Sequence, residues 1–71
     1  MRIRLSDRGR VRQLVVFLSL DPNAVVNVLG EDELEVSFLG SLTVWAQQRE
    51  TELRLRTWLA WNPDLIATLR P

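Results

Sequence analysis

Carboxylates are the only side chains in this sequence that could supply acid–base chemistry, because it contains neither cysteine nor histidine. That composition leaves no thiol and no imidazole for nucleophilic catalysis or for most transition-metal sites. Glu31, Asp32 and Glu33 are adjacent, whereas an acid–base pair needs two carboxylates held together in a dry cleft. They follow Gly30 in an expected turn, where water keeps them ordinary acids. We therefore predict that this chain is not an enzyme.

The sequence also lacks the motifs of other common catalytic and ligand-binding sites. No Gly-x-Ser-x-Gly sequence is present, and Gly9, Gly30 and Gly40 stand alone, so no loop is built to cradle phosphates. The acids around residue 32 lack the spacing of a calcium loop. Glu50 and Glu52 fall on different sides of an expected helix and have arginines nearby. We expect no cofactor and no metal site.

One small-ligand site is suggested at Ser6, Asp7, Arg8 and Gly9. Ser6 and Asp7 are residue types that cap helices, and the free N–H groups of a helix start attract anions. Arginines at positions 8, 10 and 12 would add positive charge. The alternative is a capped, solvated helix end with scattered arginines.

The elements that would position these residues follow from hydrophobic periodicity. Residues 2–5 alternate polar and apolar, which predicts a half-buried strand. Residues 11–20 fit either an amphipathic helix or a buried strand. We favour the helix, because Ser6-Asp7 opens the segment and Asp21-Pro22 closes it. Residues 24–29 and 34–38 predict a hairpin around Gly30, and residues 65–69 a last strand.

Between the hairpin and the last strand, residues Val44 to Trp61 predict one long helix that ends before Pro63. The order β-α-β-β-α-β predicts a single α+β domain over residues 1–71. Its expected fold is ferredoxin-like, a four-stranded antiparallel sheet with two helices on one face. The alternative is an α+β or all-β fold in which residues 11–20 form a strand.

The long helix carries two apolar stripes, and one sheet can cover only one of them. We expect the sheet to be covered by Leu42, Ala46, Leu53 and Ala60. The other stripe would then lie exposed and form a homodimer interface, with Phe17 in support. Its residues are Val44, Leu55, Trp58 and Leu59, and Trp45 lies between the two stripes, toward Leu59. The expected contact residues are Trp45, Leu55, Trp58 and Leu59. On this hypothesis Leu55→Glu dissolves the dimer without unfolding the chain. The alternative is that the first helix, the loops and the chain ends cover the second stripe.

Composition agrees with a small interacting protein. A chain of 71 residues buries a limited core, and small domains without disulfides or metals commonly oligomerise. Five arginines and one aspartate lie in residues 1–12, and five acids lie in residues 21–35, which suggests either two solvated surfaces or pairing between copies. Net charge is zero and the open sheet face would carry no aromatic, which argues against nucleic-acid binding. The longest apolar run is residues 14–18, and residues 1–4 do not read as a signal peptide, so we expect a cytoplasmic location away from membranes.

One short segment and the overall order of elements each resemble known proteins. Leu5-Ser6-Asp7-Arg8-Gly9-Arg10-Val11 resembles the first βα turn of ACT domains, although that turn usually has one more residue before its glycine. The resemblance implies a regulatory domain that senses an anion or amino acid. The whole order of elements resembles short bacterial βαββαβ proteins, which implies no activity. The leading expectation is a non-catalytic homodimeric module; the alternatives are an ACT-like sensor and an accessory subunit of a larger complex.

Overall fold

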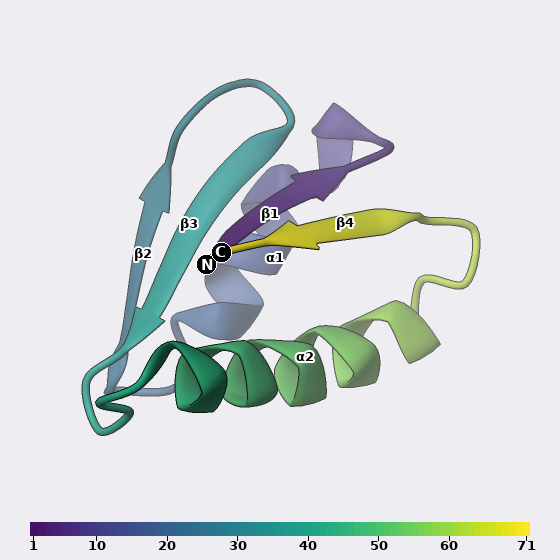
Figure 1. Ribbon diagram of the computed structural model, residues 1–71. Coiled ribbons are helices and arrows are strands. Elements are labelled where there is room, and N and C mark those ends of the chain that lie inside the picture. The colour runs from purple at the N-terminus through teal and green to yellow at the C-terminus, as the bar shows by residue number, and fades with distance from the viewer.

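The computed structural model describes residues 1–71 and has the predicted order of elements (Figure 1). Its strands are β1 (Arg2–Leu5), β2 (Ala24–Val28), β3 (Glu33–Phe38) and β4 (Ala67–Arg70). Its helices are α1 (Val11–Leu18), preceded by the 3-10 turn η1 (Arg8–Arg10), and α2 (Val44–Ala60). The sheet order is β2-β3-β1-β4, and each neighbouring pair is antiparallel. The ferredoxin-like α+β prediction is confirmed, and residues 11–18 are helical.

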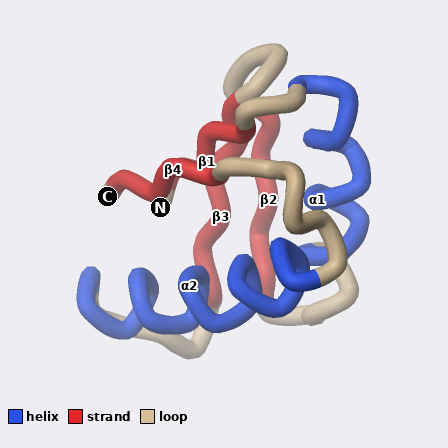
Figure 2. The backbone as a smooth tube through the Cα atoms, turned by 90° about the vertical axis from the view of Figure 1, so that its right-hand side faces the viewer, coloured by secondary structure: helices blue, strands red, loops and turns tan.

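Strand alternation sorts the side chains into a core face and an open face. Ile3 and Leu5 of β1 are buried, as are Leu34, Val36 and Phe38 of β3. These residues join buried side chains from both helices in one cluster, so α1 and α2 serve the same face of the sheet. Figure 2 shows α1 beside the sheet and α2 running below it.

The open face is charged and internally paired. Arg4 lies 3.7 Å from the Glu33 carboxylate and 3.8 Å from that of Asp32, and Arg70 lies 2.9 Å from Glu33. The register also sets Arg2 opposite Glu35. Arginines and acids are thus matched across three strands of this face, and exposed pairs of this kind add little stability each.

Residues at the start of α1 are held by side chains from far along the chain. Asp7 accepts a hydrogen bond from the Gly9 N–H at 2.8 Å and so begins the turn. Arg10 makes a bidentate pair with Asp64, at 3.1 and 3.0 Å, and donates to the Asn62 side chain at 3.0 Å. This arginine ties the start of α1 to the segment between α2 and β4.

Gln47 joins α2 to the end of β3. Its Oε1 accepts from the Phe38 N–H at 2.8 Å, and its Nε2 donates to the carbonyl oxygens of Phe38 at 2.8 Å and Ser41 at 2.7 Å. The helix itself begins at Thr43, whose side chain accepts from the Ala46 N–H at 3.0 Å. The Gln47 amide therefore continues the hydrogen bonding of β3 past the point where β1 has ended.

Candidate interaction surface

α2 presents to the sheet the face that sequence reasoning assigned to the partner. Leu55 and Trp58 are 5% and 4% exposed and belong to the core. Leu42 is 94% exposed and Leu53 is 47% exposed, although both were expected to cover the sheet. That assignment of faces is wrong. The bulkier stripe fills the space under the strands. Thr51, the one polar residue buried with it, is satisfied because its hydroxyl donates to the Gln47 carbonyl at 2.7 Å.

The predicted interface residues are therefore divided between the core and the surface. Trp58 is enclosed in the core, and Leu55 is accessible only through a groove. Leu59 is half-buried and Trp45 is exposed. Phe17 is half-buried on α1, where its ring meets Trp61 edge-on at 6.0 Å between centroids. Leu55 and Leu59 lie beside each other in one groove, whereas Trp45 lies near the start of α2 and neither Phe17 nor Trp58 lines the groove.

A groove of about 300 Å³ separates α2 from β4. Leu55, Leu59 and Leu69 form its apolar floor, and Glu52 and Arg56 stand at its rim. Leu69 belongs to β4 and was not among the predicted site residues. The groove exists because α2 packs chiefly against β3 and α1, so the β4 side of the core is left partly uncovered.

The first turns of α2 form an apolar projection near the other end of the helix. Leu42, Val44 and Trp45 are 94%, 67% and 69% exposed. They stand in a stretch from residue 36 to residue 48 that contains no charged side chain. Figure 2 shows these turns extending past β2 and β3 on the side away from α1, below the two chain termini. The projection and the groove thus lie on one helix, and no other part of the chain covers the projection or occupies the groove.

The charged residues of α2 fall into two groups. Arg54 is used within the chain: it pairs with Asp21 at 2.6 Å and Glu50 at 3.3 Å. Glu50 pairs with Arg54 four residues along the helix, whereas Glu52 accepts from the Gln48 side chain at 3.0 Å and forms no pair with Arg56. Arg49, Glu52 and Arg56 form no ion pair, and the Arg49 guanidinium lies over the Trp45 ring at 5.7 Å.

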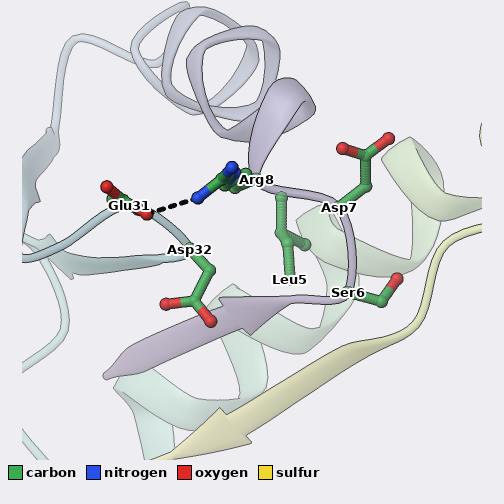
Figure 3. A pocket seen from close by; sticks show the side chains of 6 residues that line it. All are labelled: Leu5, Ser6, Asp7, Arg8, Glu31 and Asp32. Atoms are coloured by element: carbon green, nitrogen blue, oxygen red, sulfur yellow. Dashed lines mark hydrogen bonds and ion pairs between the residues drawn. The ribbon is translucent and has the colours of Figure 1, made fainter.

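Ser6, Asp7, Arg8 and Gly9 lie together in the segment that leads from β1 into α1. Three of them line a cleft of about 490 Å³, together with Leu5, Glu31 and Asp32. Figure 3 shows Arg8 reaching across this cleft to Glu31, an ion pair of 2.7 Å. Sequence reasoning missed that the hairpin between β2 and β3 forms the second wall of this cleft.

Local bonds already use several polar groups of this cleft. The Gly9 N–H donates to the Asp7 carboxylate, and the Ser6 hydroxyl accepts from the Ile66 N–H at 2.9 Å. Three carboxylates and one arginine line the cleft: Glu31 pairs with Arg8, whereas Asp32 lies 3.8 Å from Arg4 and Asp7 lies 3.8 Å from Arg10. This charge favours a ligand that brings a positive group over a simple anion.

Comparisons with other proteins add no family to this description. No family model, curated protein or solved structure matches the chain. The chain has no group of three or more acidic side chains placed to hold a metal ion. Neither helix has the length and hydrophobicity needed to cross a membrane.

Proposed function

We propose that this chain is a non-catalytic interaction module that forms a homodimer through α2. The observation that carries the proposal is the presence, on one helix, of an exposed tryptophan and an apolar groove that the chain does not fill. Trp45 precedes Arg56, at the groove rim, by eleven residues, which is about 16 Å along a helix. Two α2 helices packed antiparallel would bring the Trp45 of each copy to the groove of the other.

The charges of α2 match this arrangement. Trp45, Arg49, Glu52 and Arg56 lie within about 60° of one another around the helix, at 100° per residue. A twofold axis beside residues 50 and 51 sets Arg49 opposite Glu52 of the second copy and Trp45 opposite its Arg56. All three charged residues lack an ion-pair partner within the chain. The second copy supplies an ion-pair partner for Arg49 and for Glu52 and an aromatic ring for Arg56, and complementary rim charges of this kind fix register.

Trp45 should dominate the affinity, because tryptophans that enter a partner's pocket are common hot spots. Trp45→Ala is expected to raise the dissociation constant of the α2 contact roughly thirtyfold or more, the equivalent of about 2 kcal/mol. Trp61→Ala is the matched control, since Trp61 is 70% exposed but outside the proposed contact. Sedimentation equilibrium on the 8.2 kDa chain measures both.

A charge swap tests the geometry. Arg49→Glu should weaken the contact, and the double variant Arg49→Glu with Glu52→Arg should restore it, because the pair is re-formed across the axis. Equal effects of Trp45→Ala and Trp61→Ala would contradict the proposal. A chain that folds only beside a different co-expressed protein would instead support an accessory subunit.

The cleft at Ser6, Asp7 and Arg8 supports a second candidate, a small-ligand sensor. An amino acid fits its charges, with the carboxylate toward Arg8 and the ammonium toward Glu31 and Asp32. A thermal-shift screen of amino acids tests it, with Arg8→Ala expected to abolish the response and Arg12→Ala to retain it. The absence of any shift at millimolar ligand would contradict this candidate.

A further inference from the structure

We infer that the free edge of β2 pairs with β2 of a second copy, forming an antiparallel contact that extends the sheet. This contact lies at the opposite edge of the sheet from the groove beside β4. It does not depend on the α2 dimer, and each contact forms or fails independently of the other.

The backbone of β2 shows which groups are available. Leu29 donates to the Glu33 carbonyl at 2.9 Å, and the Asn23 carbonyl accepts from Leu39 at 2.9 Å, so odd-numbered residues of β2 bond to β3. Even-numbered residues then direct their N–H and C=O groups away from the sheet. Val26 and Val28 each offer an unpaired donor and acceptor at this edge.

The side chains of this edge do nothing to repel another strand. Residues 22–30 contain no charged side chain, and Val25, Val28 and Leu29 are 43%, 59% and 46% exposed. Proteins usually protect free edges with charges, proline, bulges or very short strands. The other edge, β4, is protected in this way: it has four residues, carries Arg70 and is followed by Pro71.

A second copy fits this edge because β2 is complementary to itself. A twofold axis through Val26 pairs Val26 with its own counterpart, Ala24 with Val28, and Val25 with Asn27. Each pair in this register is apolar or neutral, and the outward backbone groups of Val26 on both copies meet as a hydrogen-bonded pair. The axis also keeps the apolar row of Ala24, Val26 and Val28 on the helical side of both sheets.

Hydrogen exchange on the unmodified chain tests the contact directly. The amides of Val26 and Val28 have no partner within one copy, so they should exchange rapidly at low concentration. Their exchange should slow roughly tenfold or more as the concentration rises and the strands pair. The amides of Ala67 and Leu69, which point outward from β4, serve as the internal control and should stay fast.

Variants separate this contact from the α2 dimer. In a Trp45→Glu chain the α2 contact is removed, and we expect the remaining assembly to be a dimer of two 8.2 kDa copies. Adding Val28→Lys should convert that dimer to monomer, raising its dissociation constant roughly tenfold or more. Ile66→Lys, at a site that is 72% exposed and outside both contacts, should leave the dimer intact.

The outcomes distinguish the two proposals. A Trp45→Glu chain that is monomeric, with fast exchange at Val26 and Val28, overturns the β2 contact and leaves the α2 dimer standing. The α2 dimer is overturned instead if the wild-type chain assembles, keeps the same oligomeric state on Trp45→Glu and dissociates on Val28→Lys. Protection of the β2 amides that appears only with an added extended peptide would show that a foreign strand, rather than a second copy, takes this edge.

Discussion

The Gln47 side chain makes three hydrogen bonds to backbone groups at the end of β3, so Gln47→Ala should strongly destabilise the fold. The bonds measure 2.7 to 2.8 Å and reach Phe38 and Ser41 in a partly buried region. Removing the amide leaves the Phe38 N–H and the Ser41 carbonyl oxygen without their partner, whereas the Phe38 carbonyl oxygen keeps the Ser41 N–H at 3.0 Å. The loss of unfolding free energy should be largest for the backbone groups to which water cannot bind in place of the Gln47 amide.

The magnitude follows from typical hydrogen-bond energies. Three bonds at a net value of about 0.5–1.5 kcal/mol each give an upper range of about 1.5–4.5 kcal/mol. Partial exposure allows water to satisfy some of the groups, which lowers the expected loss to about 1.5–3 kcal/mol. Small domains have unfolding free energies of about 5–15 kcal/mol, so this one side chain contributes a large share.

Urea unfolding followed by tryptophan fluorescence measures the effect, at one fixed protein concentration because self-association adds to apparent stability. Gln48→Ala is the matched control: it removes the same residue type one position along the helix, where the side chain is exposed and bonds only to Glu52 at 3.0 Å. We expect the control to change stability by about 0.5 kcal/mol or less. Equal effects of the two variants would refute the role given to Gln47.

Two further substitutions test the packing of α2. Leu55→Glu should unfold most of the chain rather than merely dissolve a dimer, because it places an unpaired carboxylate where the side chain is 5% exposed. Circular dichroism would show the loss of structure, and a folded monomer would contradict the prediction. Thr51→Val should change the unfolding free energy by about 1 kcal/mol or less, since the Gln47 carbonyl keeps its helical hydrogen bond. Thr51→Ser should lower the unfolding free energy by about 1 kcal/mol, because it removes a buried methyl group. Urea unfolding compares these two, and a larger loss for Thr51→Val would show that the hydroxyl, not the methyl, stabilises this site.

The order of elements was predictable because the local signals agree with one another. Asp7 caps the 3-10 turn that leads into α1, Pro22 follows the end of α1, Gly30 marks the hairpin, and Pro63 follows the end of α2. Alternation in β3 also identifies its buried residues correctly. Where propensity, periodicity and turn residues all point to one structure, no tertiary information is needed.

The orientation of α2 was not predictable for a physical reason. Its residues offer two apolar stripes, and periodicity alone does not say which one faces the sheet. Tertiary contacts decide: Gln47 binds the end of β3, and Arg54 binds Asp21. Both anchors turn Leu55 inward, and neither has a signature in a single sequence. The groove beside β4 depends on the resulting placement of the helix, so it too required the structure.

The two proposed contacts together determine how far assembly proceeds. Each is isologous, because the same surface is used on both copies, and a single isologous contact closes at two copies. The groove beside α2 lies at the β4 side of the sheet, and the β2 contact lies at the opposite edge. A dimer formed through either contact therefore keeps the other free, and dimers join into closed tetramers or open rows according to the angle between the two axes. The protected β4 edge provides no third strand contact, so growth by strand pairing stops at each pair of β2 strands.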